Sequence, residues 1–192
     1  MPNNIINATS TGSGGLITTA ADSGSLELQS DGTTIATLSS TGLTMAAGKL
    51  LAPTGPAFNA YAGSAQSIAN TTHTKIQLNT EVFDTNNNFD PTTNYRFTPT
   101  VAGYYQLTGS VQLASTSAIS AVEIYKNGGI AAQGRGVGTG GLNQAGNVSA
   151  ILYANGSTDY FELYVYQPSG GAINTTAASD LTYMCGALIR SA

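Results

Sequence analysis

The sequence contains few charged residues. Only 8% of its 192 residues are Asp, Glu, Lys or Arg, whereas an ordinary soluble domain has about 25%. The six basic residues are scattered, so they cannot release enough counterions for nucleic-acid binding, and we expect no nucleic-acid partner. One Cys and one His exclude a disulfide within the chain and a zinc site built from these residue types alone.

Long apolar runs are also missing. No run reaches the about 18 residues of a transmembrane helix, so we expect no membrane insertion. Met1-Pro2-Asn3-Asn4 has no basic residue ahead of an apolar stretch, which predicts that no secretory signal peptide is present. The single histidine, His73, lies in a polar segment, and no nucleophile-elbow pattern occurs. We therefore expect an exposed histidine and no enzymatic activity.

The first third of the chain is rich in Gly, Thr, Ser and Asn. Residues 1–15 predict a flexible segment, either a frayed terminus or an arm that docks onto something larger. Residues 16–56 alternate short strand-like segments with turn signals, as in Leu26-Glu27-Leu28 before Asp31-Gly32. Such short strands cannot bury a core within one chain. We therefore expect 16–56 to form a β-rich stem of three copies.

Pro53 and Pro56 mark a boundary, and residues 57–192 have the size of one all-β domain. Period-two patterns predict strands at Lys75–Phe83, Gly103–Leu113, Ala121–Tyr125, Asn147–Tyr153, Tyr160–Tyr166 and Leu181–Ile189. Asn127-Gly128 and Asn155-Gly156 predict tight turns. About eight to ten strands with regular turns indicate a β-sandwich, most simply a jelly roll.

Four segments within residues 57–192 carry motifs whose spacing is found in a known family. They are Phe89–Pro99 (Phe-Asp-Pro-Thr-Thr-Asn-Tyr-Arg-Phe-Thr-Pro), Val101–Tyr105, the hairpin Tyr125-Lys126-Asn127-Gly128, and Thr182–Leu188. Together they resemble the globular head of complement C1q and the related tumour necrosis factor (TNF) superfamily. Leu78 and Leu107 stand where that family has Phe, and a collagen-like stalk is absent. The resemblance implies the fold and not a complement or cytokine activity.

The resemblance further implies a compact homotrimer, with three jelly rolls packed through an aromatic and aliphatic face. An outward row of tyrosines at 160, 164 and 166 fits such an interface, because Tyr is enriched there. An alternative is a partly exposed tyrosine face. The residues that we expect in the core or the trimer interface are Tyr105, Leu107, Phe161, Leu163, Tyr164, Tyr166, Tyr183, Met184 and Leu188.

Two loops are candidates for binding. The Gly-rich stretch Gly134–Gly141 predicts a surface loop, and Arg135, Val137, Thr139 and Asn143 are its candidate recognition residues. Asp84, Asp90 and the asparagines between them supply oxygen atoms that suit Ca²⁺, and some relatives of the C1q head bind calcium. The spacing does not match a known calcium loop, so we favour turn-forming roles and expect no cofactor.

The stem segments Gly15–Thr19 and Ser25–Thr34 resemble stems of bacteriophage fibres and other virion-surface proteins. Joined to a trimeric head, they favour a bacteriophage structural protein at the virion surface. Its arm would bind other virion proteins, and its head would adhere to host-surface carbohydrate, decorate the capsid as a cement protein, or both. A short tail spike and a capsid decoration stay open. The alternative is a secreted, extracellular C1q-like lectin or ligand-binding protein.

Overall fold

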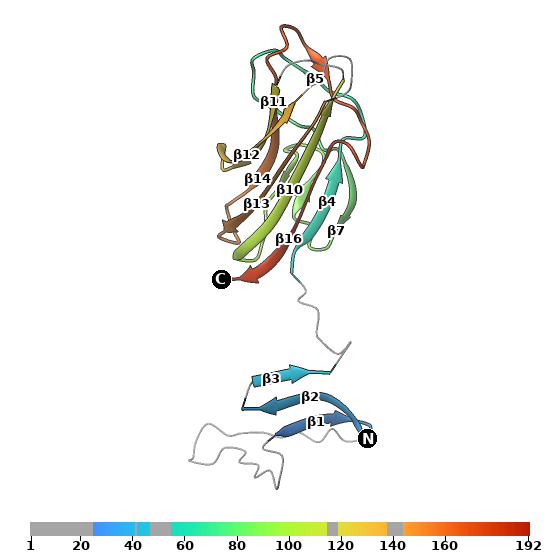
Figure 1. Ribbon diagram of the computed structural model, residues 1–192, viewed down its shortest axis with the longest axis vertical. Coiled ribbons are helices and arrows are strands. Elements are labelled where there is room, and N and C mark those ends of the chain that lie inside the picture. The colour runs from blue at the N-terminus through green and yellow to red at the C-terminus, as the bar shows by residue number, and fades with distance from the viewer. Residues whose placement is uncertain (1–24, 41, 47–54, 115–118, 138–143) are drawn as a thin grey trace. The chain divides into compact units, whose positions relative to one another are not determined.

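A computed structural model describes residues 25–40, 42–46, 55–114, 119–137 and 144–192. The chain divides into two compact units, Met1–Pro53 and Thr54–Ala192, which we call the stem unit and the head. Every regular element in the described residues is a β-strand (Figure 1). Within these residues, no helix has the length and apolar character needed to cross a membrane.

The described part of the stem unit is one antiparallel sheet of three short strands. Its strands, in the order in which they pair, are β1 (Leu26–Ser30), β2 (Thr33–Ser39) and β3 (Gly42–Met45). Asp31 and Gly32 make the first turn with φ angles of 49° and 72°, the left-handed values that a two-residue hairpin requires. The strands lie where the alternating pattern predicts them.

Pairing places the apolar residues of the stem sheet on one face. Leu26, Leu38 and Leu43 lie side by side, and Leu28, Ala36 and Met45 form the next row on the same face. The side chains of Leu28, Leu38 and Leu43 are 51%, 49% and 63% exposed. A single sheet of three short strands therefore leaves its apolar face exposed.

The head is a sandwich of two main sheets. The first is antiparallel, with the order β13-β10-β16-β4-β7 (Figure 1). Its strands are β4 (Ala57–Tyr61), β7 (Thr80–Asp84), β10 (Gly103–Leu113), β13 (Gln144–Ala154) and β16 (Tyr183–Ser191). Strand β16, the last of the chain, lies at the centre of this sheet, which we call the five-stranded sheet.

The second sheet has the order β12-β11-β14-β9-β8, with β6 also paired to β14. Its strands are β6 (Thr74–Lys75), β8 (Phe89–Asp90), β9 (Arg96–Phe97), β11 (Ile119–Lys126), β12 (Gly129–Val137) and β14 (Phe161–Tyr166). We call it the six-stranded sheet. A separate pair joins β5 (Ser67–Ile68) to β15 (Ile173–Asn174).

Aromatic side chains fill the centre of the sandwich. Phe58 stacks on Phe97 with ring centroids 4.2 Å apart, and Phe97 meets Tyr105 edge-on at 5.6 Å. The Tyr105 hydroxyl donates a 2.7 Å hydrogen bond to the backbone oxygen of Val101, so its polar end is satisfied within the core. Tyr105, Leu107, Phe161, Leu163 and Met184, which were expected in the core or the trimer interface, are fully buried within the head.

The predicted strand Lys75–Phe83 is wrong as one element. β6 pairs with β14 of the six-stranded sheet, whereas β7 pairs with β4 of the other sheet. Between them Ile76 and Leu78 are fully buried, but Val82 is 57% exposed rather than on the same inward face. The chain changes sheets here, so the alternation of side chains does not continue across the segment.

The two Asn-Gly dipeptides behave differently. Asn127 and Gly128 form the expected two-residue turn between β11 and β12, with φ angles of 52° and 81°. Asn155-Gly156 is not a tight hairpin, because it starts a loop from β13 to β14, which lie in different sheets. The Asn155 Oδ1 atom accepts hydrogen bonds from the backbone N–H groups of Ser157, Thr158 and Asp159 and so shapes this loop.

The first half of the Gly-rich stretch also differs from its prediction, and residues 138–141 lie outside the described residues. Residues 134–137 belong to strand β12 and are not a loop. A Cβ atom on Gly134 would collide with the backbone oxygen of Asn147 on β13, and one on Gly136 would lie 2.9 Å from the Ala145 oxygen. Glycine is needed here because the edges of the two sheets approach each other this closely.

Candidate interaction surfaces of the head

The outer face of the five-stranded sheet is mainly uncharged, with Arg190 of β16 at its border, opposite Tyr104. Cross-strand pairing brings twelve uncharged side chains together on this face. They are Ala57, Asn59 and Tyr61 on β4, Tyr104, Gln106 and Thr108 on β10, Ser149, Ile151 and Tyr153 on β13, and Tyr183, Cys185 and Ala187 on β16. We call these twelve residues, together with Phe83 of β7 and Ile189 of β16, the apolar sheet face.

Large apolar side chains on this face are open to solvent. Phe83, Ile151, Tyr153 and Ile189 are 47%, 57%, 42% and 53% exposed. Two hollows indent the face, one of about 510 Å³ beside Tyr104 and Ile189 and one of about 290 Å³ beside Phe83 and Cys185. Exposed apolar surface of this kind marks an interaction site in a soluble protein.

The expected interface residues of the last strand divide between the two sides of the five-stranded sheet. Tyr183 lies on the apolar sheet face, whereas Met184 points into the core and Leu188 packs against it. Cys185 also lies on the apolar sheet face, and partial burial raises the pKa of its thiol. One side of the five-stranded sheet therefore packs on the core of its own head, and the other side is available to a partner.

The tyrosine row lies on the other sheet. Tyr160 precedes β14 and Tyr164 and Tyr166 belong to it, with outward side chains that are half-buried. Tyr164 stacks on Tyr125 of β11 with ring centroids 3.9 Å apart, and burial raises the pKa of Tyr164. These tyrosines are thus partly covered by neighbours in their own chain, on the sheet opposite the apolar sheet face.

His73 has a partner that its polar sequence neighbourhood did not indicate. Its Nδ1 atom lies 2.7 Å from the Oε2 atom of Glu123, a fully buried carboxylate of β11. The other oxygen of Glu123 accepts a 2.7 Å hydrogen bond from Gln133 of β12. The His73 ring also packs against Tyr166 at 4.9 Å and remains 44% exposed. This cluster satisfies a buried charge between neighbouring strands.

The two loop aspartates bind backbone groups. Asp84 Oδ2 accepts a 2.6 Å hydrogen bond from the Phe89 N–H. Asp90 accepts hydrogen bonds from the N–H groups of Thr92, Thr93 and Asn94 and from two side chains, which hold its pKa well below the usual range. Both carboxylates therefore shape turns. Among the described residues, no three His, Cys, Asp or Glu side chains gather as metal ligands.

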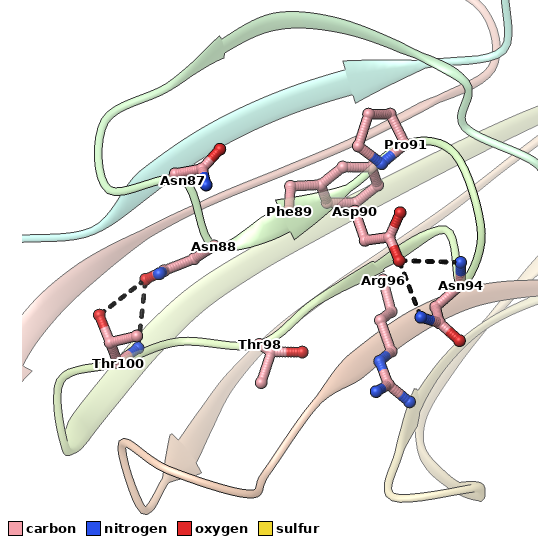
Figure 2. Close-up of a pocket in the computed structure, with 9 residues that line it drawn as sticks. All are labelled: Asn87, Asn88, Phe89, Asp90, Pro91, Asn94, Arg96, Thr98 and Thr100. Atoms are coloured by element: carbon pink, nitrogen blue, oxygen red, sulfur yellow. Dashed lines mark hydrogen bonds between the residues drawn. The ribbon is translucent and has the colours of Figure 1, made fainter.

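A cavity of about 400 Å³ lies beside these turns and was not anticipated from the sequence. Asn87, Asp90, Asn94, Arg96 and Thr98 are among the residues that line it (Figure 2). Arg96, from β9, places its guanidinium over the ring of Tyr160, 4.4 Å from the ring centroid. The sequence offers one indication of Arg96, which is that the chain has only six basic residues.

The predicted recognition residues fall largely outside this cavity. Arg135 lies on β12 with an exposed side chain, and Val137 ends the same strand. Thr139 and Asn143 lie outside the described residues. The structure therefore assigns Arg135 and Val137 to an edge strand.

Comparison with known proteins finds similarity in structure only. No protein-family model and no curated protein sequence matches the chain. Murine APRIL at pH 5.0 aligns with a TM-score of 0.57 and 7% identity over 70% of this chain and 99% of that one. The zebrafish complement 1qA globular domain gives 0.55 and 14% over 72% and 99%, and Eiger TNF from S. frugiperda gives 0.55 and 6% over 72% and 94%.

These likenesses show the fold. The chain contains an all-β jelly-roll sandwich of the C1q/TNF type, which confirms the fold class that the motifs at 89–105 and 125–128 predict. At identities of 6% to 14% the likeness carries no activity, ligand or partner with it. The function must be argued from the surfaces of this chain.

Proposed function

We propose that the chain is a homotrimeric structural protein of a bacteriophage virion surface. In this proposal the heads associate through the apolar sheet face, the arm 1–15 attaches to other virion proteins, and the head is exposed as a short spike or a capsid decoration that adheres to host-surface carbohydrate. The observation that carries the proposal is the solvent-exposed apolar sheet face, which Arg190 borders at one end. The proposal includes no catalytic role, metal or cofactor.

Charge distribution supports association through this face rather than the opposite one. The six-stranded sheet and its loops hold the ion pairs Lys75–Glu162 and Lys126–Asp159, at 2.9 Å each, together with the buried Glu123. Covering that side would require removing water from the partly exposed lysines of the two ion pairs, which costs free energy. Covering the apolar sheet face removes water mainly from aromatic and aliphatic carbon, which is favourable.

The stem unit supports the same assembly independently. Its sheet presents Leu28, Leu38 and Leu43 on one half-exposed face. Copies of this face could cover one another around an axis, as expected for the stem of a fibre or spike. Low charge over the whole sequence also fits a protein whose surface is covered by neighbouring subunits.

Light scattering on the full chain tests the trimer. Three chains of 19.5 kDa give a mass of about 58 kDa for a closed ring of heads. Ile151→Glu places a charge in the apolar sheet face and should shift the mass toward one chain, because burying an unpaired carboxylate is strongly unfavourable.

Ile130→Glu is the matched control for this test. Ile130 lies on β12 and is 52% exposed, close to the 57% of Ile151, but it lies outside the apolar sheet face. It should leave the mass unchanged. A wild-type mass of one chain, or the same loss of mass in both variants, would contradict assembly through this face.

Imaging of particles that carry this protein tests its place. Density for the protein on the capsid lattice alone supports decoration and contradicts a tail adhesin, whereas density at the tail supports a spike. Absence of the protein from purified particles would contradict the virion role altogether.

A secreted C1q-like binding protein is the second candidate. It is favoured by the likeness of the head to the complement 1qA globular domain and to Eiger TNF. This candidate requires export of the chain from the cell that makes it. Recovery of the protein only in particles or in the cytoplasm would count against it.

A further inference from the structure

The cavity beside β8 and β9 is lined by Arg96, and the acidic residue opposite it, Asp90, already accepts hydrogen bonds from other groups. Asp90 and Arg96 face each other in the register of β8 and β9. Opposed Asp and Arg residues commonly form an ion pair. Here the Asp90 carboxylate instead accepts five hydrogen bonds from the Thr92–Asn94 turn, two of them from side chains. Figure 2 shows the Arg96 side chain extending away from that carboxylate.

The position of the guanidinium group is nevertheless constrained. It lies over the Tyr160 ring, and among the described residues it has no hydrogen bond or ion pair. Stacking on an aromatic ring orients the plane of the guanidinium while its N–H edge stays available. An oriented arginine edge of this kind matches a carboxylate, which it binds through two parallel N–H···O bonds.

Besides Arg96 and Asp90, the cavity wall contains neutral polar side chains. The side-chain amide of Asn87, the Oδ1 atom of Asn94 and the hydroxyl of Thr98 have no hydrogen-bond partner among the described residues. These groups can donate to and accept from the hydroxyl groups of a sugar. The Pro91 ring adds an apolar patch against which a pyranose could lie.

The two charged residues that line the cavity favour some anionic ligands over others. Arg96 is the only basic residue among the described ones that line it, and the Asp90 carboxylate lies in the same wall. A doubly charged phosphate would bring two negative charges beside one cation and one anion, whereas each carboxylate of an acidic sugar brings one, which the arginine can pair. The abundance of neutral hydrogen-bonding groups favours a ligand with several hydroxyls.

We propose that this cavity binds an acidic sugar, with the sugar carboxylate on the Arg96 guanidinium and the hydroxyls on Asn94 and Thr98. The inference deepens the proposed attachment to surface carbohydrate and rests on that function for the source of the sugar. It does not rest on the trimer, because every lining residue belongs to one segment of one chain.

Titration calorimetry of the full chain with trigalacturonate tests the proposal, with the methyl-esterified trisaccharide as the uncharged comparison. Arg96→Gln should weaken binding of the acid at least about tenfold, because a charge-assisted bidentate contact is lost. Arg135→Gln makes the same change in charge at an exposed position on β12 and should bind as the wild type does.

The other variants separate recognition from folding. Arg96→Lys keeps the charge and loses the planar fork, so binding should again fall while the thermal melt stays cooperative. Thr98→Val should weaken binding of both trisaccharide forms several-fold. Equal affinity for the acid and its ester, unchanged binding by Arg96→Gln, or acetate binding as tightly as trigalacturonate would each overturn the proposal.

The oligomeric state is measured on the same samples. Specific binding by a chain that scatters light as a monomer would support the sugar site and contradict the trimer. A trimer that does not distinguish trigalacturonate from its ester would overturn the sugar site and leave the trimer standing.

Discussion

At the scale of single residues, aspartates of the head act as backbone acceptors. Asp84 and Asp90 hold the turns that follow β7 and β8. Asp159 accepts hydrogen bonds from the Asn127 side chain and the Asn155 N–H, and pairs with Lys126 at 2.9 Å. These contacts favour the ionised form, so the pKa values of Asp90 and Asp159 lie below their usual range, first through hydrogen bonds and, for Asp159, also through Lys126.

Acid should therefore destabilise the head. An aspartate with a lowered folded-state pKa contributes stability above its unfolded-state value, here 3.8, and this contribution is lost as the pH falls through the folded-state pKa. Urea unfolding of the wild type should show falling stability from about pH 5 downward. Asp159→Asn should be less stable at pH 7 and should lose less stability on acidification. A variant with the wild-type slope would contradict this assignment.

Some residue roles were predictable and others were not. Tyr105 and Phe161 alternate with polar neighbours, and this pattern alone places them in the core. No such pattern identifies Arg96. Among the described residues its guanidinium is left without an ion pair, because residues 92–94 donate hydrogen bonds to the Asp90 carboxylate. His73 is exposed, as expected, but its contact with Glu123, fifty residues away in the sequence, was not predicted. Contacts between distant segments are invisible to a local pattern.

At the scale of elements, local turn signals predict structure only where both flanking strands stay in one sheet. Asn127-Gly128 does so, and its hairpin follows from two left-handed residues. Asn155-Gly156 carries the same dipeptide, but the strands on either side belong to different sheets. The same limit explains why Lys75–Phe83 divides into β6 and β7. The jelly roll was predictable from strand number and motif spacing, whereas the crossings between sheets depend on packing.

The close approach of β12 and β13 is an element-scale feature that a substitution can test. Gly134→Val should destabilise the head by about 1–3 kcal/mol, because the new side chain meets the backbone of β13 and cannot be relieved by a rotamer change. Gly129→Ala, on the same strand, adds a Cβ whose nearest neighbour is 3.8 Å away, so it should change stability by less than about 0.5 kcal/mol. Equal urea midpoints for both variants would contradict the observed packing.

At the scale of the whole molecule, the two sides of the head differ in chemistry. One side carries ion pairs, stacked tyrosines and the Arg96 cavity, and the other is the apolar sheet face, bordered by Arg190. If the apolar sheet face is covered in the assembly, the ligand-binding groups on the opposite side stay open to solvent. Assembly and recognition can thus proceed without competing for surface.

The thiol of Cys185 reports on this assembly. Its raised pKa leaves little thiolate at neutral pH, and association through the apolar sheet face would bury it further. Alkylation of the folded wild type at pH 7.5 should therefore be slow compared with the urea-unfolded chain. Ile151→Glu should accelerate alkylation of the folded chain, whereas Ile130→Glu should not. Equal rates in both folded variants would indicate that Cys185 is not covered by a partner.

The thin stem sheet has a consequence for the order of assembly. Its leucine face is too small to hold free chains together at ordinary dilution. If three heads associate as proposed, however, each stem sheet would be tethered near two others at an effective concentration that can reach the millimolar range for short linkers. A contact too weak to form between separate molecules would then close. The heads would set the number of chains in the assembly, and contacts between the stems would stabilise it in a second, intramolecular step.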